Sequence, residues 1–122
     1  MDSPGPILNS ELVDQWFASS PPDEQASDRK TANLLRTTVG PRIARLRTTI
    51  TGMAAQDAER ELHNLRGSVA SFGFIACAAY LLALEHGWQK LPLDQRMAML
   101  TAASETFDEG LVQLFARFPH LR

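Results

Sequence analysis

The residues of this chain that could do chemistry gather in one short run, His63-Asn64-Leu65-Arg66-Gly67-Ser68. If this run is helical, successive residues are about 100° apart, and His63 lies about 130° from the centre of the neighbouring apolar stripe. The imidazole then points at solvent, and the cationic side chain of Arg66 lies one turn further along the same helix. An ordinary histidine has a pKa of about 6.5, so near neutral pH its neutral ring nitrogen is a good nucleophile. The run therefore predicts phosphoryl-transfer chemistry, with His63 as the nucleophile and Arg66 near the phosphoryl oxygens.

This histidine is better equipped to carry a phosphoryl group than to catalyse a reaction alone. An enzyme needs a pocket, a second catalytic group and exclusion of water, and the run supplies little of this. Phosphoryl transfer mainly needs in-line positioning and neutralisation of charge, both of which a partner can supply. The chain also has no glycine-rich phosphate loop, no nucleophile elbow and no His-x-x-x-His or Cys-x-x-Cys pair. We therefore expect a carrier protein that binds no metal and no cofactor of its own.

The residues around His63 on the same face of the helix are small or polar, which suits the docking of a partner. Gly67, four residues on, leaves no side chain in the way of a partner, although glycine costs a helix about 1 kcal/mol relative to alanine. The alternative reading is that Gly67 lets another helix approach closely. The helical wheel disfavours it, because Gly67 lies even further from the apolar stripe than His63 does. The predicted docking residues are Gln56, Glu59, Gly67, Ala70 and Ser71.

Length, composition and charge describe one globular domain. The chain has 122 residues, of which 44% are hydrophobic, enough for one domain with its own core. A net charge of −2, and basic residues without interleaved aromatic ones, argue against a nucleic-acid surface. The longest apolar run, residues 72–84, is shorter than the roughly 20 residues that span a bilayer, so no membrane contact is expected. Cys77 is the only cysteine and no secretory signal is evident, which predicts a cytoplasmic protein without an intrachain disulfide.

The apolar residues follow helical spacing along most of the chain, and no segment alternates with period two. After a flexible tail over residues 1–8, a short helix begins near Asn9 or Ser10, either of which can cap it. Four long helical segments are expected over residues 27–53, 54–72, 74–85 and 93–118. Gly40-Pro41 interrupts the first of these, so it is either one kinked helix or two nearly coaxial pieces. The prediction is one all-α domain, an antiparallel up-and-down four-helix bundle with a short extra N-terminal helix.

Two of these helices have a clear predicted core side. In the helix over residues 54–72 the apolar stripe consists of Ala55, Ala58, Leu62, Leu65, Val69 and Phe72. In the last helix the predicted core positions are Leu93, Met97, Leu100, Phe107, Leu111, Leu114 and Phe118, with Ser104 where the spacing skips a position. Gly73 is expected in the left-handed conformation that often ends a helix.

The run from His63 to Ser68, with Phe72-Gly73-Phe74 and Leu84-Glu85 beyond it, resembles the histidine-containing phosphotransfer (HPt) domain family. The family pattern is His-x-Leu-Lys-Gly-Ser/Ala, a glycine about six residues further and a Leu-Glu pair that ends the next helix. The upstream residues that also fit its usual lead-in helix and turn are Val39, Pro41, Leu46 and Asp57. The resemblance in motif covers roughly residues 35–85, and the order of the helices covers the whole chain.

The resemblance implies a four-helix intermediate of a phosphorelay, and since a carrier needs no dimer we expect a monomer. His63 would accept a phosphoryl group from an aspartate of a response-regulator receiver domain, which binds Mg²⁺, and pass it to another receiver. Arg66 takes the place of the usual lysine, which keeps the charge but changes the geometry. Leu62 and Asn64 also depart from the residues common at their positions, and these departures concern the choice of partner more than phosphorylation. Phe72-Gly73-Phe74 is also similar to the phosphotransfer domain of chemotaxis-type kinases, so a sensor histidine kinase is a second expected partner.

A second hypothesis is a helical interaction module that is never phosphorylated. It would use the same exposed face to bind and regulate a receiver domain or another enzyme. The residues leave open which of these two the chain is, which receivers donate and accept, and whether the domain stands alone or was cut from a hybrid kinase.

Overall fold

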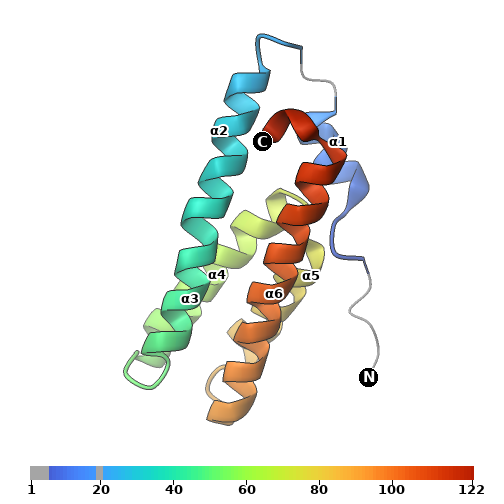
Figure 1. Cartoon of the computed structure of the whole chain (residues 1–122). Coiled ribbons are helices and arrows are strands. Elements are labelled where there is room, and N and C mark those ends of the chain that lie inside the picture. Colours follow the sequence, from blue (N-terminus) through green and yellow to red (C-terminus); the bar gives the residue numbers. More distant parts are fainter. Residues whose placement is uncertain (1–5, 19–20) are drawn as a thin grey trace.

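The computed structural model describes residues 6–18 and 21–122, and every regular element in these ranges is a helix (Figure 1). The elements are α1 (Ser10–Phe17), α2 (Gln25–Leu34), the π-helix η1 (Leu35–Val39), α3 (Gly40–Thr49), α4 (Ala55–Ser71), α5 (Ile75–Gly87), α6 (Leu93–Arg117) and the 3₁₀-helix η2 (Pro119–Leu121). The predicted all-α bundle is confirmed: α2, η1 and α3 form one long segment, α4, α5 and α6 are the other three, and α1 is the short N-terminal helix. None of the helices within the described ranges is both long and apolar enough to cross a membrane.

α2 continues into α3 without a break, through the single π-turn η1 that precedes Pro41. Proline has no amide N–H, and inside an α-helix its ring clashes with the carbonyl group four residues earlier, here that of Thr37. A π-turn just before the proline widens the helix there, so the chain stays helical across Gly40 and Pro41. Of the two predicted possibilities, the structure therefore has one continuous helical segment, from Gln25 to Thr49.

The core is built from apolar residues of every long helix, and α4 contributes the stripe predicted for it. Ala58, Leu62, Leu65 and Val69 are fully buried, and Ala55 and Phe72 at the ends of the stripe are half-buried. The prediction for α6 was wrong at Leu93, which is the first residue of the helix and is 45% exposed. It was also wrong at the skipped position, where Ala103 is buried and Ser104 is half-buried. Alanine takes this place because its methyl group needs no hydrogen-bond partner in the core.

The N-terminal segment packs on the turn between α4 and α5, so the flexible tail predicted over residues 1–8 was too long. Leu8 belongs to the core, and the carbonyl oxygen of Ile7 accepts a hydrogen bond from the amide of Ala76 at 3.4 Å. Burial of these two apolar side chains removes them from water, which favours an ordered segment. Residues 1–5 of the expected tail lie outside the described ranges. Asn9 caps α1 as predicted, since its Oδ1 accepts a backbone N–H of the first turn at 3.2 Å.

Gly73 ends α4 and turns the chain into α5. Its amide donates to the carbonyl of Ala70 at 3.0 Å, and the amide of Phe74 donates to the carbonyl of Val69 at 2.9 Å, which is the Schellman pattern. Its φ is +86°, in the left-handed region that residues with a side chain rarely adopt. A Cβ at this position would also lie 3.2 Å from the carbonyl oxygen of Asn9. Backbone conformation and packing therefore both require glycine here, and the predicted left-handed conformation is confirmed.

Replacing Gly73 with alanine should lower the free energy of unfolding by about 2 kcal/mol, because the left-handed conformation alone costs a residue with a side chain about 1–2 kcal/mol. Urea denaturation followed by circular dichroism measures the change. Gly67→Ala is the matched control: a Cβ at Gly67, inside α4, meets nothing within 4 Å, so alanine should raise the free energy of unfolding by up to about 1 kcal/mol. If the two variants changed stability alike, the special role of Gly73 would be refuted.

Candidate functional site

His63 lies on the exposed side of α4, near the middle of the helix, as the helical wheel predicted. Its side chain is 62% exposed, whereas Leu62 and Leu65 on the opposite side are fully buried. The sequence of α4 produces this division because its apolar residues recur every three or four positions and its polar residues fill the rest. The buried side fixes the helix to the bundle, and the histidine is presented on the other.

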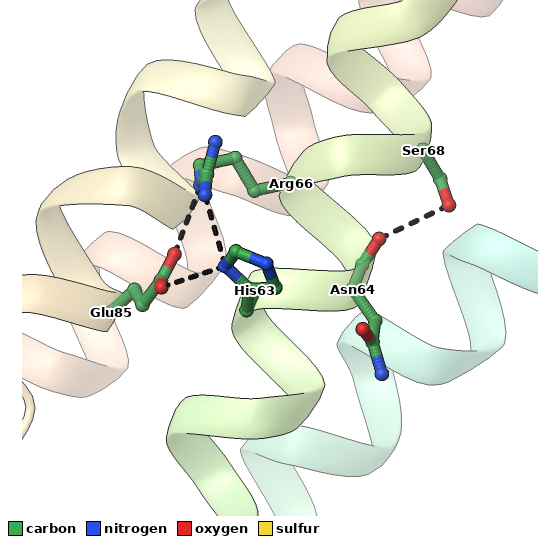
Figure 2. Close-up of polar contacts among 5 residues, drawn as sticks. All are labelled: His63, Asn64, Arg66, Ser68 and Glu85. Atoms are coloured by element: carbon green, nitrogen blue, oxygen red, sulfur yellow. Dashed lines mark hydrogen bonds and ion pairs between the residues drawn. The ribbon is translucent and has the colours of Figure 1, made fainter.

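Three side chains meet at this point, His63 and Arg66 from α4 and Glu85 from α5 (Figure 2). His63 Nδ1 is 3.0 Å from Glu85 Oε2, and Arg66 Nε donates to Glu85 Oε1 at 2.9 Å. Arg66 Nη2 lies 3.0 Å from the same Nδ1 atom. Within the described residues no hydrogen bond reaches Nε2, the nitrogen on the far side of the ring. The contacts therefore hold the ring by Nδ1 and leave Nε2 to the outside.

Nδ1 cannot use both of its neighbours at once. A protonated Nδ1 donates to Glu85 but has no lone pair for Arg66, whereas a bare Nδ1 accepts from Arg66 and faces the lone pairs of the carboxylate. An ionised carboxylate only accepts hydrogen bonds, so Glu85 favours the tautomer with the proton on Nδ1. In that tautomer Nε2 holds the lone pair and is the nucleophilic atom of the ring.

The pKa of Glu85 is set by two opposing effects. Burial raises the pKa of this carboxyl, but the hydrogen bonds from Arg66 and His63, together with their charges, lower it by more. The net pKa is below the usual value for glutamate, so the side chain is ionised at neutral pH. The ionised Glu85 can therefore accept a hydrogen bond from His63 in the tautomer with the proton on Nδ1.

Glu85 was not among the predicted site residues, although it contacts both His63 and Arg66. It is 22 positions from His63, and only the pairing of α4 with α5 brings the two together. Helical periodicity describes one helix at a time and carries no information on that pairing. The one available signal is the Leu84-Glu85 pair in the resemblance to the phosphotransfer family, and a sequence motif does not show which side chains are in contact.

The predicted docking residues all lie on the side of α4 that bears His63, with different degrees of exposure. Gln56, Gly67 and Ser71 are exposed, and Glu59 and Ala70 are half-buried. The hydroxyl of Ser71 donates to the carbonyl of Gly67 at 2.8 Å. This hydrogen bond holds the Ser71 side chain against the helix, so it does not project toward a partner. Since a Cβ at Gly67 would meet nothing within 4 Å, no other described helix approaches this residue. The alternative role of Gly67, close packing of a second helix, is therefore wrong.

An apolar groove of about 430 Å³ lies beside this face, between α4, α1 and the α2–η1 segment. Two of its wall residues are large, apolar and exposed, Trp16 at 46% and Leu34 at 61%. Trp16 packs on Phe72 with ring centroids 4.4 Å apart, and its Nε1 donates to the carbonyl of Ser71 at 2.9 Å. Through Ser71 the groove adjoins the docking face. Sequence reasoning missed it, because its walls come from three separate segments and Leu34 lies off the apolar stripe of its own helix.

Comparison of the chain with protein-family models, with curated proteins and with solved structures found no match. The chemistry of the site is therefore inferred from its geometry. The exposed imidazole of His63 contacts the ionised carboxylate of Glu85, and Arg66 Nη2 lies 3.0 Å from His63 Nδ1.

Replacing Glu85 with glutamine should lower the free energy of unfolding at pH 7, by at most about 1 kcal/mol, because it removes the charge that Arg66 contacts. The pKa of Glu85 is lower in the folded chain than in the unfolded one. Its stabilisation is therefore complete above the unfolded pKa of about 4.3 and is lost as the pH falls through the folded value. Urea denaturation at pH 7 and at pH 3 should show a smaller difference between wild type and variant at the lower pH.

Glu105→Gln is the control for this measurement. Glu105 is exposed on α6 and has no ion pair within the described residues, so its replacement should leave the free energy of unfolding nearly unchanged at both pH values. A difference between wild type and Glu85→Gln that is the same at pH 7 and pH 3 would mean that the charge of Glu85 does not stabilise the fold.

Proposed function

We propose that this chain is a histidine phosphotransfer domain of a phosphorelay. His63 accepts a phosphoryl group from the phosphorylated aspartate of a response-regulator receiver domain and passes it to the aspartate of another receiver. The observation that supports this most directly is that the two ring nitrogens of His63 have different surroundings. Nδ1 contacts Glu85, and Nε2 faces outward without a hydrogen bond from the described residues. A carrier needs this combination, because its nucleophile must be oriented and yet accessible to two partners in turn.

The transfer is a displacement at phosphorus in which the charges balance within the site. The lone pair of His63 Nε2 forms the N–P bond while the P–O bond to the donor aspartate breaks, and the carboxylate leaves with the electron pair. The proton on Nδ1 stays on the ring, hydrogen-bonded to Glu85, so the positive charge that the ring gains lies against a carboxylate. No proton has to move, and the second transfer follows the same path in reverse.

Arg66 would supply positive charge to the phosphoryl group during this step. Its Nε is fixed by Glu85, while Nη2 lies beside the ring and has no acceptor at Nδ1 once that atom carries the proton. The free N–H groups of the guanidinium can then donate to phosphoryl oxygens on Nε2. Glu85 is accordingly a positioning residue, since it orients both the nucleophile and the cation without touching the transferred group.

The rest of the chemistry comes from the partner. A side chain that is 62% exposed has its reacting atoms in water until another surface covers them, so His63 alone does not make the chain an enzyme. A receiver domain would bring the aspartyl phosphate and its own Mg²⁺ to the face around Gly67, and the apolar groove beside that face offers Trp16 and Leu34 to the same partner. A sensor histidine kinase is the other expected partner, further up the relay.

Incubation with an aspartate-phosphorylated receiver domain should label this chain on His63, with a phosphoryl group that is labile in acid and stable in alkali. His63→Gln should take up no label while keeping its helical content, because the side chain is exposed and its loss leaves the core unchanged. The measurement is transfer of radioactive phosphate to the chain, repeated over the receiver domains of the source organism. Full labelling of His63→Gln, or no labelling of the wild type by any receiver, would overturn the proposal. Receiver binding without labelling, unchanged in His63→Ala, would point instead to the unphosphorylated interaction module.

Gly67→Gln should slow phosphoryl transfer about tenfold or more, because a long side chain at this position stands where the partner must approach His63. The fold should tolerate it, since the surroundings of Gly67 are open and glutamine is a better helix former than glycine. The measurement is the initial rate of transfer from the labelled receiver, with the thermal midpoint of unfolding recorded alongside. Gly67→Ala adds a smaller side chain at the same position and should reduce the transfer rate less. Transfer by the glutamine variant at the wild-type rate would show that the partner docks elsewhere.

A further inference from the structure

A second hollow, of about 370 Å³, lies between α2 and the C-terminal end of the chain. Its lining consists of Arg29, Asn33, Arg36, Phe115, Leu121 and Arg122. None of these residues belongs to the His63 face or to the apolar groove. On α2, the groove is lined by Thr31 and Leu34, and the hollow by Arg29 and Asn33, so the helix separates the two.

Every charged side chain that lines this hollow is an arginine. Three of its six residues are arginines, and no acidic side chain is among them. No ion pair joins Arg29, Arg36 or Arg122 to an acidic residue in the part of the chain that the structure describes, whereas Arg42, Arg66 and Arg117 each have one. Like charges that line one hollow repel one another, and a bound anion relieves that repulsion.

Two of the arginines are held in place by hydrogen bonds to other polar atoms. Arg36 Nη2 donates to Asn33 Oδ1 at 2.7 Å, and Arg29 Nη1 donates to the carbonyl oxygen of His120 at 3.3 Å. His120 is in turn 3.3 Å from the carboxylate of Asp28, which fixes η2 against α2. These contacts use one donor of each guanidinium, and the remaining N–H groups have no partner among the described residues.

The chemistry of the lining indicates what kind of anion would fit. Guanidinium groups match phosphate oxygens in shape and charge, and two or three of them suit a ligand with several negative charges. Phe115 and Leu121 add a half-buried ring and a buried aliphatic side chain, which inorganic phosphate would not use. A planar base can pack on such a wall while its phosphates reach the arginines, and the volume is within the range of small-ligand sites, about 300–1,000 Å³.

We propose that this hollow binds a nucleoside polyphosphate, with the phosphates on Arg29, Arg36 and Arg122 and the base against Phe115. The site would make this domain a nucleotide-binding protein as well as a carrier. The inference does not rest on phosphotransfer at His63, because the two sites share no residue.

Calorimetric titration of the chain with ATP, without added metal and at physiological salt, tests the site. ATP should bind with a dissociation constant below about 1 mM, inorganic triphosphate more weakly, and adenosine not measurably, because charge and base contacts are both needed. Chemical shifts of the backbone amides should change at Arg29, Asn33, Arg36 and Phe115. Triphosphate binding as tight as ATP would mean that the arginines attract any polyanion, and the proposal would fail. It would also fail if ATP did not bind.

Arg36→Glu and Arg47→Glu form a matched pair for the same titration. Both arginines are exposed, lie on the same long helical segment and have no ion pair within the described residues, but only Arg36 lines the hollow. Arg36→Glu should weaken ATP binding about tenfold or more, and Arg47→Glu by less than about twofold. Equal weakening by the two would show diffuse attraction to a basic surface and refute the site. Labelling of His63 by a receiver should be unaffected by Arg36→Glu. Phosphotransfer at His63 and nucleotide binding in the hollow are therefore tested independently.

Discussion

The site depends on one backbone constraint, the left-handed turn at Gly73. His63 precedes this turn by ten residues and Glu85 follows it by twelve, which is about 15 and 18 Å along an α-helix. Two antiparallel helices joined at Gly73 therefore bring these residues to nearly the same height, where their side chains can meet. The same turn supports the N-terminal segment, because the amide of Asn9 donates to the carbonyl of Gly73 at 2.7 Å. Gly73 thus supports both the pairing of α4 with α5 and the position of α1.

The ion-pair geometry at the site explains how an exposed histidine can be oriented at all. Side chains at the surface lose rotamer freedom only when contacts compensate for it, and isolated surface ion pairs contribute little. Glu85 is 17% exposed and Arg66 is 28% exposed, so their contact is better shielded from water than the histidine they hold. The carboxylate uses one oxygen for each partner, Oε1 for Arg66 and Oε2 for His63. A shielded pair therefore orients an exposed ring without burying it.

Those features that arise within one helix could be predicted from the sequence. The exposure of His63, the buried stripe of α4 and the left-handed Gly73 follow from helical periodicity and from the special conformation of glycine. Features that depend on contacts between two or more helices could not be predicted from the sequence. Glu85 meets His63 only through the pairing of two helices, and the walls of the apolar groove come from three segments. The sequence does not predict the burial of Leu8, because a short apolar stretch near a chain end has no periodicity to show where it packs.

The π-turn before Pro41 has a consequence for how this chain can vary in length. A π-turn holds one residue more than the α-helical turn it replaces, and one residue is about 100° of rotation. Loss of any residue from Leu35–Val39 would thus turn α2 by about that angle relative to α3, if α3 kept its place in the core. Leu34 would leave the groove and Arg29 the hollow, although neither had been changed. Both surfaces of α2 therefore depend on the π-turn, which itself lines the groove with Leu35, Thr38 and Val39 and the hollow with Arg36. Related chains without the π-turn would have to build these surfaces from other positions.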